Sequence, residues 1–194
     1  MTIAFVTTNN HKFTEVSDIL KEFDIAIEQV SFDYAENHDS SLEEVASTAS
    51  IEVSTKLNRP IILEDTGIFF DAYEGFPGAL PKFVFNTLGY RGIFKLLENE
   101  KRDVYFKTVA AYCEPQSTPK LFTGIMRGKI TTEVFDANKD AMPYDRIFIA
   151  DQLPGKVFSR LSITEKTNYL KEAPPSDNLA SGMDKITYHD KQER

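Results

Sequence analysis

The fold is decided by residues 3–23, which read IAFVTTNNHKFTEVSDILKEF. The first four residues are a short apolar run, as in a buried strand, and the run ends in the polar residues 7–10. From Phe13 to Phe23, apolar side chains recur at helical spacing. The stretch therefore predicts a strand, a polar turn and a helix, in that order.

The pattern of alternating strands and helices continues along the chain. Residues 25–32 alternate as a second strand. Ser41 and Glu44 form a capping-box pattern at the start of a helix that Pro60 ends. The segment PIILEDTGIFFDA, residues 60–72, predicts a buried strand, an acidic break and a further strand.

The second half of the chain contains longer strands. Residues 82–98 predict a helix that is interrupted near Gly89 to Gly92. Strands are expected at 103–113, 120–135 and 147–150, followed by a short helix at 162–170. The result is an α/β fold with residues 1–173 as one domain and residues 174–194 as a polar tail.

Composition excludes several classes of protein. The formal net charge of −8 argues against a general nucleic-acid binder, because no basic field collects phosphates. Cys113 is the single cysteine and cannot form an internal disulfide. No segment approaches the roughly 18 apolar residues that a membrane span needs, and the first residues lack a signal-peptide pattern. We expect a soluble, cytoplasmic protein that does not bind membranes.

The first candidate site is the turn before the opening helix. Free backbone N–H groups and the positive end of a helix dipole make such a turn a natural phosphate site. Asn9 or Asn10 lies where the helix begins, and Lys12 in its first turn adds a positive charge. The alternative is that Asn caps the helix while Lys12 is solvated.

The second candidate is the pair Glu64–Asp65, which we expect at the end of an apolar strand. Ligands usually bind at that edge of an α/β sheet, and Mg²⁺ prefers one or two carboxylates plus phosphate oxygens and water. The alternative is a solvated acidic turn. Glu36 and Asp39, in an acidic loop, offer a further carboxylate.

The third candidate is Gly75-Phe76-Pro77-Gly78, which lies four residues before Lys82. As an isolated pattern it indicates a turn. A P-loop is absent, because the residues GIMRGK at 124–129 have the wrong spacing. No nucleophilic triad can be assembled from the sequence.

Taken in order, these motifs resemble the inosine triphosphate pyrophosphatase family, which hydrolyses non-canonical purine nucleoside triphosphates. The resemblance begins with Thr7-x-Asn9-x-x-Lys12-x-x-Glu15 and continues through residues 41–46, 64–72 and 75–82. In the C-terminal third it is carried by Tyr144-Asp145, Ile147-Phe148, Gly155-Lys156, Leu161-Ser162 and Glu165-Lys166.

The departures from the family concern recognition of the base. The family's aromatic-Gly-aromatic-Asp motif appears here as Met142-Pro143-Tyr144-Asp145, and its Ser-His-Arg motif is replaced by Leu170-Lys171-Glu172. Met is no stacking platform for a purine, and Glu cannot replace Arg. Hydrolysis of triphosphates is therefore implied more directly than a preference for one base.

The resemblance implies a long central sheet flanked by helices, two lobes around a nucleotide-binding cleft, and a homodimer. It implies Mg²⁺-dependent cleavage to monophosphate and pyrophosphate, with Asp65 positioning or deprotonating the attacking water. The catalytic residues it implies are Asp65 and Lys12. The implied metal ligands are Glu36, Glu64 and Asp65. The implied substrate-binding residues are Thr7, Asn9, Lys12, Lys82, Tyr144, Asp145 and Lys166.

Two alternatives belong to other functional classes. One is a nucleotide-binding homologue that is catalytically silent or altered in specificity. Its weakness is that a silent protein has no need of Lys12, Glu64 and Asp65. The other is an interaction protein that uses its acidic surface.

Overall fold

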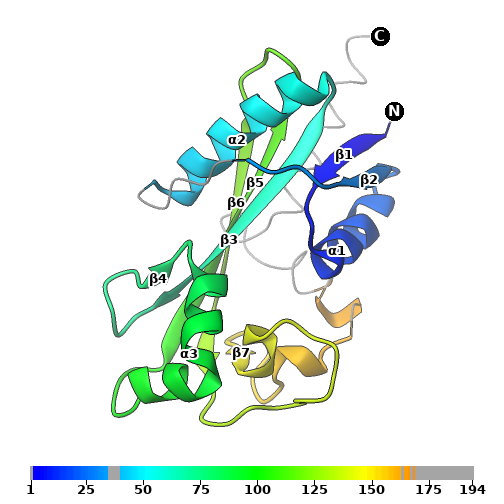
Figure 1. Ribbon diagram of the computed structural model, residues 1–194. Helices are drawn as coiled ribbons and strands as arrows, with labels where there is room; N and C mark the ends of the chain where they lie inside the picture. Colours follow the sequence, from blue (N-terminus) through cyan, green and yellow to red (C-terminus); the bar gives the residue numbers. More distant parts are fainter. Residues whose placement is uncertain (1, 35–39, 163, 167, 169–194) are drawn as a thin grey trace. The chain divides into compact units, whose positions relative to one another are not determined.

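The computed structural model describes residues 2–34, 40–162, 164–166 and 168. It has a mixed α/β architecture with a seven-stranded sheet in the order β2-β1-β3-β5-β6-β7, and β4 pairs with β3 (Figure 1). Along the chain the elements are β1 (Ile3–Val6), α1 (Asn10–Lys21), β2 (Ile27–Val30), α2 (Leu42–Leu57), β3 (Ile61–Phe70), β4 (Pro77–Gly78), α3 (Pro81–Leu96), β5 (Asp103–Cys113), β6 (Lys120–Ile130), η1 (Tyr144–Arg146), β7 (Phe148–Ala150) and η2 (Phe158–Arg160). The predicted fold class, a central sheet flanked by helices, is confirmed.

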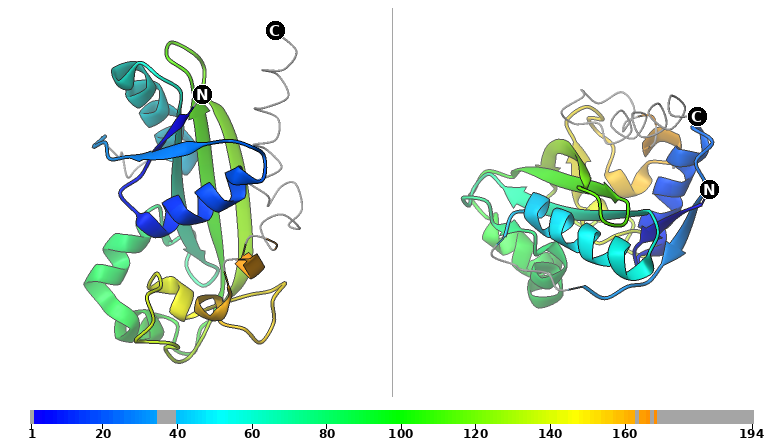
Figure 2. Two further views of the ribbon diagram at one scale, coloured as in Figure 1. Left: turned by 90° about the vertical axis from the view of Figure 1, so that its right-hand side faces the viewer. Right: turned by 90° about the horizontal axis from the view of Figure 1, so that it is seen from above.

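Contacts between residues divide the chain into two compact units, each of which is described by itself. Unit 1 comprises residues 1–65, 108–124 and 167–194, and unit 2 comprises residues 66–107 and 125–166. Strands β3, β5 and β6 have residues in both units. Figure 2 shows β5 and β6 as long neighbouring strands. That residues 1–173 form one functional domain stays a prediction, and the tail 174–194 lies outside the described residues.

Unit 1 opens with the predicted strand, turn and helix. Strand β1 pairs in parallel with β2 on one side and with β3 on the other. Phe5 of β1 lies opposite Gln29 of β2 and Ile62 of β3. Val6, the last residue of β1, lies opposite Leu63, so the turn that follows β1 begins beside Glu64 in the middle of β3.

The core of unit 1 has helices on both faces of its sheet. Phe5, Ile62 and Ala110 form a buried cluster with Leu20 of α1. Side chains alternate along a strand, so Cys113 lies on the face opposite Ala110. Ser54 of α2 approaches Cys113 with a distance of 3.4 Å between Oγ and Sγ, which places α2 on that second face. Figure 1 shows α2 running along these strands.

The predicted break at Glu64–Asp65 is wrong. Strand β3 runs without interruption from Ile61 to Phe70 and includes both carboxylates. The reason is tertiary: β1 pairs with β3 up to Leu63 and β4 pairs with it from Ile68, so pairing before and after the acidic residues keeps the chain extended through them. Its last residues also pair with β4, where Ile68 lies opposite Gly78.

Unit 2 contains helix α3, which is interrupted as predicted. Gly89 has φ 60° and ψ −173°, a conformation that suits a residue without a Cβ. The predicted strand at 120–135 is wrong beyond Ile130. The guanidinium of Arg102 binds the carbonyl oxygens of Ile130, at 2.8 Å, and of Thr131, so these groups no longer serve a neighbouring strand.

No helix among the described residues is long and apolar enough to cross a membrane.

Candidate functional site

In unit 1, the turn between β1 and α1 is built by short side-chain contacts. The Oδ1 atom of Asn9 accepts hydrogen bonds from the backbone N–H groups of His11, at 2.9 Å, and Lys12, at 3.3 Å. The N–H of Asn9 in turn donates to Oγ1 of Thr7 at 3.1 Å. Asn9 is therefore the N-cap of α1, as one of the two alternatives predicted.

A further residue holds this turn against the sheet. Nε2 of Gln29 in β2 donates to the carbonyl oxygen of Thr7 and to Oδ1 of Asn10, each at 3.2 Å. No local sequence signal points to Gln29, because its contacts join residues about twenty positions apart.

Lys12 is not solvated, which contradicts the second half of that alternative. Its ammonium forms an ion pair with the carboxylate of Glu64, and the two side chains are 25% and 10% exposed. Burial alone lowers the pKa of Lys12. The nearby carboxylates, Glu64 first and then Asp65 and Glu15, outweigh burial and raise the pKa above its ordinary value. Lys12 therefore stays charged at neutral pH.

The same carboxylates suit a divalent metal in their chemistry. Glu64, Asp65 and Glu15 act on a single ammonium, which leaves an excess of negative charge. Mg²⁺ takes one or two protein carboxylates together with phosphate oxygens and water. Among the described residues, no three His, Cys, Asp or Glu side chains form a group that could hold a metal ion. The predicted ligand Glu36 lies outside the described residues.

The arrangement of the acidic pair differs from a solvated turn. Because β3 is continuous, Glu64 and Asp65 occupy successive strand positions, whose side chains project to opposite faces of the sheet. Glu64 shares the face of Ile62, which packs with α1, and this places it within reach of Lys12. Asp65 is partly buried and influences Lys12 through its charge.

In unit 2, the predicted residues Asp145 and Lys166 meet. Nζ of Lys166 lies 2.9 Å from Oδ2 of Asp145, and the side chains are 14% and 10% exposed. The same ammonium lies 4.6 Å from the ring centroid of Phe158. Ser162 and Glu165 form a second capping box just before Lys166, at the start of the predicted short helix. Phe158 was missed, because nothing in the sequence relates it to Lys166.

Tyr144, which precedes Asp145, lies in the interior of unit 2. Its side chain is 7% exposed, and its ring contacts the edges of Phe85 and Phe106. Its hydroxyl donates to the carbonyl oxygen of Pro81 at 3.2 Å. Burial raises the pKa of Tyr144, so the phenol stays protonated. Lys82, next to Pro81, is exposed in the first turn of α3.

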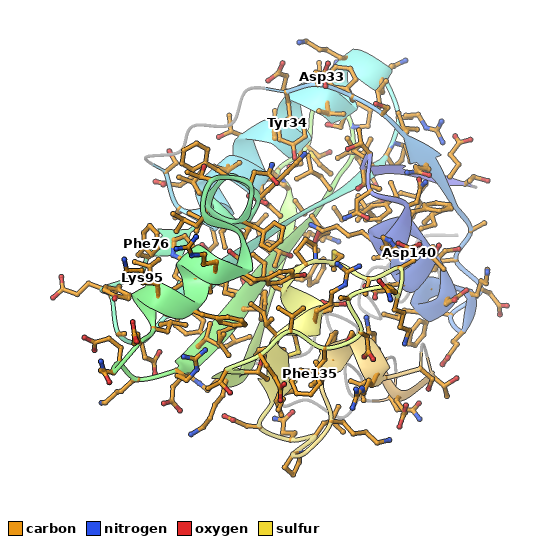
Figure 3. All side chains as sticks on the ribbon, turned by 60° about the horizontal axis from the view of Figure 1, so that its bottom comes forward. Asp33, Tyr34, Phe76, Lys95, Phe135 and Asp140 are labelled. Atoms are coloured by element: carbon orange, nitrogen blue, oxygen red, sulfur yellow. The ribbon has the colours of Figure 1, made fainter. Side chains whose placement is uncertain are left out.

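The altered motif Met142–Asp145 forms a turn. The N–H of Asp145 donates to the carbonyl oxygen of Met142 at 3.1 Å. The hydroxyl of Tyr90 in α3 donates to the carbonyl oxygen of Pro143 at 3.0 Å. The segment of residues 131–141 leads from β6 into this turn and carries Phe135 and Asp140, which are labelled in Figure 3.

Each unit therefore assembles part of the predicted set. Unit 1 brings Thr7, Asn9, Lys12 and Glu64 together at the start of α1. Unit 2 brings Asp145 and Lys166 together and connects Tyr144 to Pro81, the neighbour of Lys82. The replaced motif Leu170-Lys171-Glu172 lies outside the described residues.

Comparison with known proteins agrees with these motifs. The Ham1 family pattern matches residues 3–173. A protein of Methanosarcina mazei named dITP/XTP pyrophosphatase is 41% identical over 178 residues, which cover 91% of this chain and 94% of that protein. One of the same name from Methanopyrus kandleri is 40% identical over 86% of this chain and 87% of its own. Enzymes with this name are hydrolases acting on phosphoric anhydrides.

Solved structures show the same fold at lower identity. A HAM1 protein from Coxiella burnetii has a TM-score of 0.73 at 17% identity and covers 97% of this chain and 99% of its own. The Staphylococcus aureus Ham1 protein has a TM-score of 0.67 at 21% identity, with coverage of 98% and 100%. With the family pattern and the sequence relatives, these likenesses confirm the resemblance, and the chain belongs to the Ham1 family.

Proposed function

We propose that the chain hydrolyses non-canonical purine nucleoside triphosphates, such as ITP, dITP and XTP, to the monophosphate and pyrophosphate. The observation that carries the proposal is the ammonium of Lys12 beside Glu64 and Asp65, at the N-terminal turn of α1. The names of the relatives support it, because they are dITP/XTP pyrophosphatases.

Binding of the triphosphate is assigned to charge and backbone dipoles. The positive end of the α1 dipole favours an anion at this turn, while Asn9 accepts the hydrogen bonds of the His11 and Lys12 N–H groups. Thr7 and Asn9 hold the turn in shape, and Lys12 supplies a positive charge that the surrounding carboxylates maintain. In unit 2, Lys82, exposed at the start of α3, is the cation that the resemblance implies for phosphate.

Hydrolysis is assigned to Asp65. Its carboxylate orients the attacking water and takes its proton, while Lys12 stabilises negative charge on the phosphate oxygens. Glu64, with Glu36, would hold Mg²⁺, which when bound would neutralise phosphate charge and polarise the scissile phosphorus. Asp65 is the third ligand that the resemblance implies, and because its side chain projects to the other face of β3, that role stays a prediction. Phosphoryl chemistry relies on positioning and charge, which agrees with the lack of a predicted nucleophile.

Recognition of the base is assigned to Asp145 and Lys166. The ion pair holds the Asp145 carboxylate in place, where its oxygens accept hydrogen bonds from a purine edge. We further propose that the chain works in the cytoplasm as a nucleotide-pool enzyme. The homodimer that the resemblance implies stays a prediction.

A panel of nucleotides tests the proposal. ITP, dITP, XTP, ATP and GTP are assayed with Mg²⁺ and with EDTA. We expect turnover of the first three only with the metal, and a loss of about 10²- to 10⁴-fold in kcat for Asp65→Asn. Glu74→Gln removes an exposed carboxylate elsewhere and should retain full activity. Full turnover by Asp65→Asn would remove this residue from the chemistry.

The same panel separates the proposal from a silent nucleotide-binding homologue. A silent homologue would be thermally stabilised by ITP, because ligand binding to the folded state raises the melting temperature, yet would release no product. An interaction protein that uses its acidic surface would show neither effect.

A further inference from the structure

We infer that Tyr144 is a positioning residue that fixes the separation between the phosphate-binding Lys82 and the base-binding Asp145. Its hydroxyl donates to the carbonyl oxygen of Pro81 at 3.2 Å. Pro81 is the first residue of α3 and precedes Lys82, while Tyr144 precedes Asp145. One hydrogen bond thus joins the immediate neighbours of two residues that the proposed function assigns to one nucleotide.

The position of Tyr144 supports action through its neighbours. The residue is 7% exposed, and its ring makes T-shaped contacts with Phe85 and Phe106 at centroid distances of 5.9 Å and 6.2 Å. These two ring contacts leave the ring little freedom, and its hydroxyl already donates to the carbonyl oxygen of Pro81. The sequence motif alone placed Tyr144 among the residues that bind substrate directly.

The turn of residues 142–145 contacts α3 at a second point, and the two contacts reach different parts of the helix. The hydroxyl of Tyr90 donates to Pro143 at 3.0 Å, but Tyr90 follows the non-helical Gly89. Tyr90 therefore holds the turn against the segment of α3 beyond the interruption. Tyr144 alone among these hydroxyls reaches the end of the helix that carries Lys82.

The chain offers a matched control at the other end of the same helix. The hydroxyl of Tyr73 donates to the carbonyl oxygen of Leu96, the last residue of α3. Tyr73→Phe and Tyr144→Phe therefore make the same chemical change: each removes one hydroxyl from a tyrosine bound to a backbone carbonyl of α3. Only Tyr144 contacts the end near Lys82.

The test combines kinetics and binding in a double-mutant cycle. The KM for ITP is measured with Mg²⁺, and the Kd for ITP is measured calorimetrically in EDTA. The loss of one hydrogen bond predicts that Tyr144→Phe raises both constants about fivefold, with kcat changed by less than about twofold. Tyr73→Phe should leave both constants unchanged. It should lower the melting temperature about as much as Tyr144→Phe does.

The effect of Tyr144→Phe in a Lys82→Ala protein shows whether Tyr144 acts through Lys82. In Lys82→Ala, where the residue that Tyr144 positions is missing, Tyr144→Phe should change the Kd by less than about twofold. A full fivefold effect in that background would overturn the inference, because Tyr144 would then act on the nucleotide without Lys82. So would an unchanged Kd in the single variant. ITP binding with no turnover would refute the proposed hydrolysis, while the Kd values would still decide the role of Tyr144.

Discussion

The ammonium of Lys12 in α1 pairs with the carboxylate of Glu64 in β3, and both side chains are largely withdrawn from water. The pair joins the first turn of a helix to a central strand of the sheet. A charge so placed contributes to stability through its partner, and it is also available to an anionic ligand at the turn. Stability and nucleotide binding should therefore both depend on Lys12.

Replacement of Lys12 separates these two contributions. Lys12→Met removes the ammonium that pairs with the largely buried carboxylate of Glu64 and should lower the free energy of unfolding by about 1–3 kcal/mol. The double variant Lys12→Met/Glu64→Leu should recover most of that loss, because an apolar pair replaces the buried charges. Neither variant should turn over ITP. Urea unfolding and activity assays check this, and a double variant as unstable as the single one would contradict it.

The capping box of α2 gives a purely structural prediction. Oγ of Ser41 accepts a hydrogen bond from the N–H of Glu44 at 3.2 Å, and the Glu44 carboxylate accepts one from the N–H of Ser41 at 2.9 Å. Ser41→Ala should lower the free energy of unfolding by about 1 kcal/mol without changing the KM. Thr48→Ala, at an exposed position of the same helix, is the control and should be neutral within about 0.5 kcal/mol.

Gly128 in β6 is required by close packing. A Cβ at this position would lie 2.5 Å from the ring of Phe148 and would also meet the carbonyl oxygen of Ile149. Both belong to the paired strand β7 and have little room to move. Gly128→Ala should therefore destabilise by about 1–3 kcal/mol, as measured by thermal unfolding. Lys129→Ala, the exposed neighbour, should have a small effect, and equal melting temperatures for the two variants would be inconsistent with this packing.

The decrease in the free energy of unfolding at acidic pH should depend on Glu165. Hydrogen bonds from Lys156 and from Ser162 lower the pKa of Glu165 from 4.5 to about 2. The folded-state pKa is depressed, so the stabilisation is complete above the ordinary pKa and is lost as the pH falls through the folded value. The difference in unfolding free energy between wild type and Glu165→Gln should be constant above about pH 5.5 and shrink steadily below about pH 4.5. If this difference in unfolding free energy grew as the pH fell, it would contradict a lowered pKa for Glu165 in the folded state.

Local signals predicted most of the elements. The spacing of apolar residues within positions 3–23 predicted the opening strand and helix. The high content of Thr and aromatic residues predicted β5 with its observed bounds. The glycines at 89 and 92 marked the interruption of α3 correctly. In each case the sequence within about one element is sufficient, because periodicity and capping act over a few residues.

Long-range contacts account for what was missed. The continuity of β3 through Glu64–Asp65 follows from pairing with β1 before these residues and with β4 after them, which overrides the local acidic signal. The bonds from Gln29 to Thr7 and from Tyr144 to Pro81 join residues 22 and 63 positions apart. Motif spacing named the candidate residues, but only the fold shows which of them touch.

The most direct test of the account is the identity of the products formed from ITP. Phosphorus NMR distinguishes the two possible cleavages in a single reaction with Mg²⁺. The account predicts inosine monophosphate and pyrophosphate in equal amounts, with no orthophosphate. Inosine diphosphate with orthophosphate, or ITP that persists unchanged, would contradict it.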